Sequence, residues 1–200
     1  LPKPLRPSAN RQSFIDDAGH ELAGSRQSAA PEEDNGRILL CPLPADLQEA
    51  TNGAGWRQLA DLLADLPGRA LIDLSEGLAV DFSAAPAAGG AGEDGAGHGN
   101  EVIFLAREIK GLERSTVLVH GLDRLYQDAV RNSENPNSNL PRLEARRQFD
   151  EMRVALSRST DKLVLLEPPG APVLAELGVE QLPGHYPISW DSLIELLRTE

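Results

Sequence analysis

The chain has 200 residues, of which 40% are hydrophobic and 25% are charged, and its formal net charge at pH 7 is −12. This composition is typical of one globular domain with a sizeable core, and no apolar run approaches the length of a membrane span. Cys41 is the only cysteine and the four histidines are scattered, which excludes an internal disulfide and argues against a metal site. We therefore expect a soluble cytoplasmic protein without a metal centre. Because the chain begins with Leu1 rather than methionine, we also expect a fragment of a longer protein.

The acidic charge is unevenly distributed along the chain. Residues 101–167 contain eleven Lys or Arg and eleven Asp or Glu, so the excess of acid lies in the flanks, for example at Asp16, Asp17 and residues 32–34. A net negative charge argues against nucleic-acid binding, whereas a neutral segment rich in arginine can still contact phosphates. The composition leaves both possibilities open.

Strands and helices are expected to alternate along the chain. The expected helices share an apolar stripe of helical period and span residues 14–22, 56–66, 121–130, 145–156, 172–177 and 190–197, the last with Ser189 as its N-cap. The expected strands are short apolar runs at residues 37–41, 69–74, 78–82, 101–105, 115–119 and 163–166. Residues 83–100 are a glycine-rich flexible linker and residues 131–141 a polar loop. This alternation predicts one α/β domain, a parallel sheet flanked by helices.

An arginine lies where an amphipathic helix meets a buried strand. The apolar face of this helix comprises Ala145, Phe149, Met152 and Leu156. Arg158 follows the helix, and the strand at residues 163–166 comes directly after it, in the sequence V-A-L-S-R-S-T-D-K-L-V-L-L. Ligands of open α/β sheets gather at such loop–strand junctions, so Arg158 is a candidate ligand of a phosphate. The alternative is an arginine that is simply exposed to solvent.

A second candidate segment, K-G-L-E at residues 110–113, lies between two expected strands. Gly111 permits a tight backbone that can approach a ligand closely. Lys110 and Glu113 beside it could meet a phosphate and a sugar hydroxyl, respectively. Taken alone, this tetrapeptide could equally be a surface turn.

Both segments resemble motifs of superfamily 1 DNA helicases of the UvrD/Rep type. The Arg158 segment is similar to motif VI, V-A-x-T-R-A-x-x-x-L-x-L, and residues 110–113 are similar to motif V, H-x-x-K-G-L-E-[FW]-x-x-V. Two positions depart from motif V, because Arg107 replaces its histidine and Arg114 replaces its aromatic residue. A further motif of the family, L-x-x-N-Y-R-S, matches only in its apolar framework, with Arg11 displaced by one position from the family's arginine.

The resemblance covers roughly residues 5–166 and implies the second RecA-like motor domain of an ATP-dependent DNA helicase. In that family the motif VI arginine, here Arg158, reaches the γ-phosphate of ATP that is bound on a neighbouring domain. The implied nucleotide-binding residues are Lys110, Gly111, Glu113 and Arg11, and the implied DNA-binding residues are Arg107 and Arg114. A role in DNA repair is typical of such enzymes.

The resemblance also implies partners that the chain does not contain. ATP with Mg²⁺ would be bound mainly by an N-terminal RecA-like domain of the same protein, and single-stranded DNA would be the partner. The chain has no G-x-x-x-x-G-K-[ST] segment, so we expect no ATP hydrolysis by this chain alone. The alternative is a non-catalytic RecA-like module with an interaction or regulatory role, which the net negative charge and Arg107 favour.

Overall fold

Six parallel strands form one sheet, in the order β3-β2-β4-β5-β1-β6. The computed structural model describes residues 37–49, 53–65, 67–78, 102–109, 111–134, 139–179 and 185–199. The strands are β1 (Arg37–Pro42), β2 (Arg69–Asp73), β3 (Ile103–Phe104), β4 (Arg114–His120), β5 (Ser159–Glu167) and β6 (His185–Pro187). The predicted α/β class with a parallel sheet is confirmed, and the architecture is consistent with a RecA-like fold.

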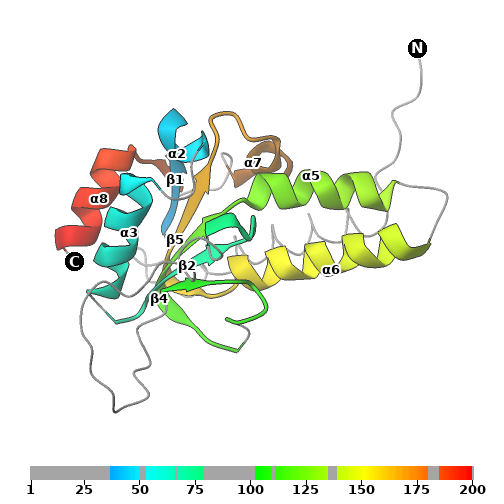
Figure 1. Cartoon of the computed structure of the whole chain (residues 1–200), viewed down its shortest axis with the longest axis horizontal. Helices are drawn as coiled ribbons and strands as arrows, with labels where there is room; N and C mark the ends of the chain where they lie inside the picture. Colours follow the sequence, from blue (N-terminus) through cyan, green and yellow to red (C-terminus); the bar gives the residue numbers. More distant parts are fainter. Residues whose placement is uncertain are drawn as a thin grey trace.

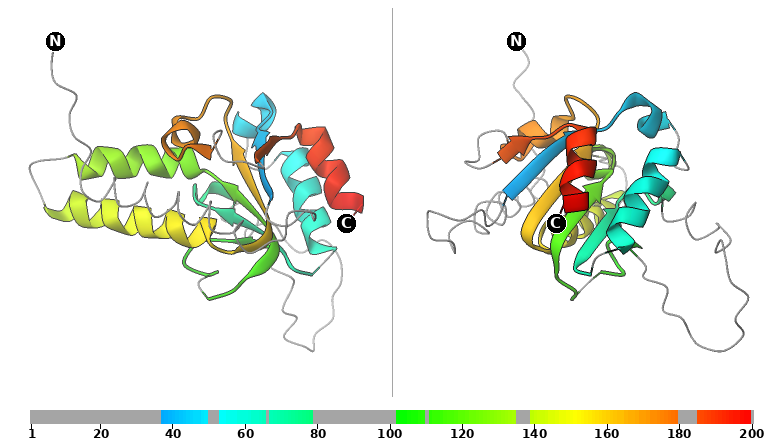
Figure 2. Two further views of the ribbon diagram at one scale, coloured as in Figure 1. Left: turned by 180° about the vertical axis from the view of Figure 1, so that it is seen from behind. Right: turned by 90° about the vertical axis from the view of Figure 1, so that its left-hand side faces the viewer.

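Helices cover both faces of the sheet (Figures 1 and 2). The helices are α2 (Ala45–Glu49), α3 (Ala54–Ala64), α5 (Leu122–Ser133), α6 (Asn139–Leu156), α7 (Pro172–Glu176) and α8 (Trp190–Thr199). We call the side covered by α5, α6 and α7 face A and the side covered by α2, α3 and α8 face B. The longest two helices, α5 and α6, lie side by side as a hairpin (Figure 1). None of the described helices is long and apolar enough to cross a membrane.

The four strands β1, β2, β4 and β5 each contribute to two hydrophobic cores, because successive side chains of a strand point to opposite faces. The face A core receives Ile38, Ala70, Ile72, Val117, Val119, Leu163 and Leu165 from the strands. The face B core receives Leu39, Cys41, Leu71, Leu118, Val164 and Leu166. Strands that are covered on both sides read as continuous apolar runs, which is why the sequence predicts them well.

Most expected elements differ from the structure only at their ends, whereas α2 and β6 were not expected. The four residues predicted to form the apolar face of α6, Ala145, Phe149, Met152 and Leu156, are all buried. Both ends of the polar segment 131–141 are helical, because α5 continues to Ser133 and α6 already begins at Asn139. Leu78, predicted to start a strand, lies in a helical turn. The predicted helix at residues 14–22 and the linker at residues 83–100 lie outside the described residues.

A buried arginine ties the ends of two face B helices to the sheet. Arg69, at the start of β2, is only 6% exposed. Its Nη1 donates to the carbonyl oxygen of Leu197 in α8 at 2.6 Å and to that of Leu62 in α3 at 3.4 Å. The last carbonyls of a helix lack partners within the helix, so this guanidinium satisfies acceptors that would otherwise be buried unpaired.

The first turn of α5 is fixed by a glycine and a buried carboxyl group. Gly121 has a φ of +79°, and a Cβ atom there would come within 2.8 Å of the backbone nitrogen of Ser75. Glu167, at the end of β5, accepts hydrogen bonds from the backbone N–H groups of Leu122 at 2.7 Å and Asp123 at 3.2 Å. Burial raises the pKa of the Glu167 carboxyl to about 8, although these two hydrogen bonds act in the opposite direction.

The close approach at Gly121 predicts a large effect of a methyl group. Gly121→Ala combines a left-handed backbone with a clash against main chain, so it should lower the free energy of unfolding by about 3 kcal/mol. Gly170→Ala is the matched control, because Gly170 also has a positive φ but nothing lies within 4 Å of its Cβ position. That variant should lose only about 1 kcal/mol in urea denaturation. Equal losses would mean that the contact with Ser75 relaxes without cost.

The raised pKa of Glu167 predicts a pH dependence of stability. An acid whose pKa is higher in the folded state stabilises the fold fully below its unfolded pKa of 4.5, and this contribution is lost as the pH rises through about 8. Glu167→Gln remains neutral, so its free energy of unfolding relative to wild type should rise over this range, by up to about 4 kcal/mol. Chemical denaturation at several pH values measures the difference. A difference that stays constant with pH would show that Glu167 is ionised throughout.

Candidate functional site

The two segments singled out in the sequence meet at the amino ends of β4 and β5. These strands pair in parallel with Arg114 opposite Ser159. The backbone N–H of Arg114 donates to the carbonyl oxygen of Arg158 at 3.0 Å, and the hydroxyl of Thr160 donates to the carbonyl oxygen of Arg114 at 3.3 Å. Residues 111–113 precede β4 and Arg158 precedes β5, so segments about 45 residues apart in the chain lie next to each other at one edge of the sheet.

The side chain of Arg158 is half-buried and folds back on the end of α6. Its Nε donates to the carbonyl oxygen of Val154 at 3.1 Å, and its Nη2 donates to the hydroxyl of Ser157 at 2.9 Å. Arginine is favourable at this position because the last carbonyls of a helix need donors and carry partial negative charge. These two contacts leave further N–H donors of the guanidinium for an external acceptor.

The segment before β4 forms a tight turn that presents its side chains to solvent. Gly111 has a φ of +84°, which favours glycine, and the N–H of Leu112 donates to the carbonyl oxygen of Ile109 at 3.0 Å. Leu112 is 41% exposed, which is high for a leucine, and Glu113 is exposed as well. Lys110 and Arg11, the other two predicted nucleotide ligands, lie outside the described residues.

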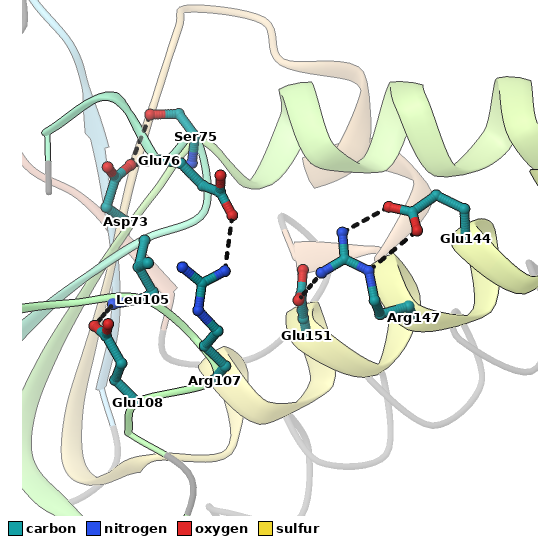
Figure 3. A network of polar contacts seen from close by, with 9 residues as sticks. All are labelled: Asp73, Ser75, Glu76, Leu105, Arg107, Glu108, Glu144, Arg147 and Glu151. Atoms are coloured by element: carbon teal, nitrogen blue, oxygen red, sulfur yellow. Dashed lines mark hydrogen bonds and ion pairs between the residues drawn. The ribbon is translucent and has the colours of Figure 1, made fainter. Parts of the chain in front are cut away.

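The two arginines predicted to bind DNA lie at different edges of the sheet. Arg114 begins β4 at the amino edge, where its Nη1 donates to the carbonyl oxygen of Glu113 at 3.1 Å and its guanidinium lies 6.0 Å from the ring centroid of Phe104. Arg107 follows the carboxyl end of β3 and pairs with Glu76 at 3.3 Å (Figure 3). Both side chains of this pair are more than half exposed, so the pairing contributes little stability and Arg107 can exchange its partner.

Sequence reasoning missed four polar residues, two that contact predicted residues and two at the carboxyl ends of strands. Ser157 orients Arg158, but a serine before an arginine gives no signal of that contact. Glu76 adopts a φ of 60°, unusual for a residue other than glycine, and its pairing with Arg107 spans 31 positions. His120 and Asp73 end two neighbouring strands and contact each other at 3.2 Å. A search for polar residues at the ends of apolar runs would have found this last pair.

The comparisons with known proteins add little to this geometry. No protein-family model and no curated protein matches the chain. Among solved structures, the chain is similar to the C-terminal domain of a possible DNA helicase from Lactobacillus plantarum WCFS1, with 18% sequence identity, a TM-score of 0.36, and coverage of 92% of this chain and 99% of that chain. A TM-score this low supports no conclusion about the chain.

The amino edge can supply positive charge and hydrogen-bond donors to an anion, but it is not a complete site. Arg158 and Arg114 are the described cations closest to the junction of the two segments. No described group of three or more histidine, cysteine, aspartate or glutamate residues is arranged to hold a metal ion. A phosphate that contacts Arg158 would therefore need further ligands from elsewhere.

The geometry of Arg158 predicts a modest structural contribution. Arg158→Ala removes two hydrogen bonds from a half-buried side chain, so the free energy of unfolding should fall by about 1 kcal/mol. Arg146→Ala, which removes an exposed arginine from the middle of α6, is the control and should change it by less than about 0.5 kcal/mol. Urea denaturation distinguishes the two variants. A loss above 3 kcal/mol for Arg158→Ala would assign this arginine to the structure rather than to a ligand.

Proposed function

We propose that this chain is the second RecA-like motor domain of an ATP-dependent DNA helicase, of the UvrD/Rep type. Its amino edge would face the nucleotide, ATP with Mg²⁺, that a preceding RecA-like domain of the same protein binds. The observation that supports this proposal is the contact between the motif V-like and motif VI-like segments, joined by the hydrogen bond from Arg114 to Arg158. The parallel pairing of β4 with β5 brings both segments to one edge, as a shared ligand would require.

Arg158 would act by electrostatics rather than by proton transfer. A guanidinium remains charged at any physiological pH and donates from a planar fork that matches phosphate oxygens. In phosphoryl transfer, negative charge on the transferred group and the leaving oxygen is stabilised by such positioned cations. To reach a neighbouring domain, Arg158 would exchange its contacts with Val154 and Ser157 for phosphate oxygens. Both present contacts are with neutral acceptors, so this exchange favours the charged partner.

The segment before β4 would connect the nucleotide to the DNA. Gly111 permits the turn, and Glu113 beside it is exposed. In the proposed complex, Glu113 would contact a sugar hydroxyl of the nucleotide. Leu112 offers an exposed apolar side chain that a neighbouring domain could cover. At the other edge, Arg107 would contact the DNA backbone after releasing Glu76, because a phosphate competes well against an exposed ion pair.

A non-catalytic RecA-like module remains the second candidate. The chain carries a net charge of −12, and Arg107 is already paired with Glu76. In such a module the amino edge would bind a partner domain without hydrolysing nucleotide. The following two predictions separate this candidate from the motor domain.

Loss of Arg158 should abolish hydrolysis without unfolding the domain. In the full-length protein, Arg158→Ala should lower steady-state ATP turnover by roughly a thousandfold or more, which is the scale of losses for arginine fingers. ATP affinity should change far less, because the other domain provides most contacts. Arg146→Ala is the matched control and should retain wild-type turnover. Normal turnover of Arg158→Ala, measured beside a normal melting curve, would contradict the motor assignment.

Reversal of the charges before β4 should uncouple ATP turnover from DNA. The double variant Lys110→Glu with Glu113→Lys should fold normally, since Glu113 is exposed, but single-stranded DNA should stimulate its ATPase weakly. A control double variant on α8, Glu195→Arg with Arg198→Glu, reverses an exposed pair outside residues 110–113. If DNA stimulates both double variants as strongly as wild type, residues 110–113 are a surface turn.

A further inference from the structure

A crevice opens at the carboxyl ends of the strands, on the opposite edge from Arg158. The chain leaves β1 toward α2 on face B, whereas it leaves β4 toward α5 on face A. Because β5 lies between these two strands, the connections diverge above its carboxyl end (Figure 1). Open α/β sheets bind ligands where neighbouring connections part in this way. A cavity of about 220 Å³ lies here. It is lined mainly by α2, by the carboxyl ends of β4 and β5, and by the first turn of α5.

The floor of the crevice holds a histidine that a buried aspartate orients. The Nδ1 of His120 lies 3.2 Å from Oδ1 of Asp73, whose side chain is fully buried. The same oxygen accepts hydrogen bonds from the backbone N–H of Ser75 at 3.0 Å and from its hydroxyl at 2.6 Å, part of which Figure 3 shows. An ionised carboxylate only accepts, so the proton of a neutral His120 lies on Nδ1. Its Nε2 has no partner in the described part of the chain and is available as an acceptor.

The rim of the crevice provides one cation and one amide acceptor. Arg124, in the first turn of α5, is exposed and makes no ion pair with the described residues. Gln48 donates its Nε2 to the carbonyl oxygen of Leu43 at 2.7 Å, which leaves its Oε1 free to accept. The backbone N–H groups of Leu122 and Asp123 already donate to Glu167, so the side chain of Arg124 would hold an anionic group.

We propose that this crevice binds a small sugar phosphate. Hydroxyl groups of the sugar would donate to Nε2 of His120 and Oε1 of Gln48, while the phosphate would pair with Arg124. The side-chain acceptors of the lining, which also includes Asp123 and Glu167, favour a hydroxylated ligand, and the single cation, Arg124, favours one anionic group. The cavity is smaller than the roughly 300–1,000 Å³ of sites for drug-sized ligands, which excludes a dinucleotide. The ligand could be a free sugar phosphate or the terminal nucleotide of a nucleic-acid strand.

Calorimetric titration of the protein with ribose 5-phosphate tests the site. Arg124→Gln should weaken binding at least about tenfold, as expected for the loss of a charged hydrogen bond. Gln48→Ala should weaken it severalfold, and its side chain is exposed, so the fold should not depend on it. Arg131→Gln is the matched control, because Arg131 lies on the same helix with its side chain 77% exposed and outside the crevice. It should bind like wild type.

The remaining probes identify the ligand's source and the role of the sugar. Ribose and inorganic phosphate should each bind more weakly than ribose 5-phosphate. A second outcome is that ribose 5-phosphate does not bind, whereas a short single strand of nucleic acid with a 5′ phosphate does. If Arg124→Gln weakens binding of that strand, the crevice is a site for nucleic-acid ends. Two outcomes would overturn the proposal. One is that inorganic phosphate binds as tightly as ribose 5-phosphate, and the other is that Arg124→Gln changes the affinity for none of the probes.

Discussion

The parallel pairing of β4 with β5 is the constraint on which both edges of the molecule depend. Parallel strands bring their amino ends to one edge and their carboxyl ends to the other, whatever lies between them in sequence. The pairing sets Arg114 opposite Ser159 and, beyond a one-residue register shift between Arg114 and Thr116, sets His120 opposite Leu166, next to Glu167. One pairing therefore brings residues 111–113 to Arg158 and brings His120 close to the buried carboxyl group of Glu167. A slip of one residue would turn Val117, Val119, Leu163 and Leu165 away from the face A core.

The two edges hold their polar groups in different ways. At the carboxyl edge, Asp73 and Glu167 are buried and accept several hydrogen bonds, so their positions are tied to folding. At the amino edge, Arg158 makes two contacts from a half-buried position, and Glu113 is exposed. A side chain that must change partners during a domain movement is better placed at such an edge, where the exchange costs little. Rigid recognition of a small ligand is better served by the carboxyl edge.

Local pattern in the sequence was sufficient for most of the elements, but it missed α2 and β6 and did not predict how the elements assemble. The apolar runs predicted β1, β2, β4 and β5, because a strand that is buried on both faces has a continuous apolar sequence. Helical periodicity predicted the buried face of α6, because a helix that is buried on one side has apolar residues at helical spacing. The strand order β3-β2-β4-β5-β1-β6 leaves no such trace, since it depends on contacts between distant residues. For the same reason, the sequence did not show that Arg107 and Arg114 lie at opposite edges. Ser157 and Glu76 were missed because neither is unusual in type or spacing, and only their contacts give them a role.

The aromatic residues of face B give the carboxyl edge an optical property. Trp56 and Trp190 are the only two tryptophans of the chain, and their rings meet edge to face with centroids 5.9 Å apart. The imidazole of His120 meets Trp56 in the same manner at 4.9 Å. Trp56 therefore touches both the other tryptophan and a histidine that lines the crevice. The intrinsic fluorescence of the protein therefore reports on one corner of the fold, and it needs no added label to do so.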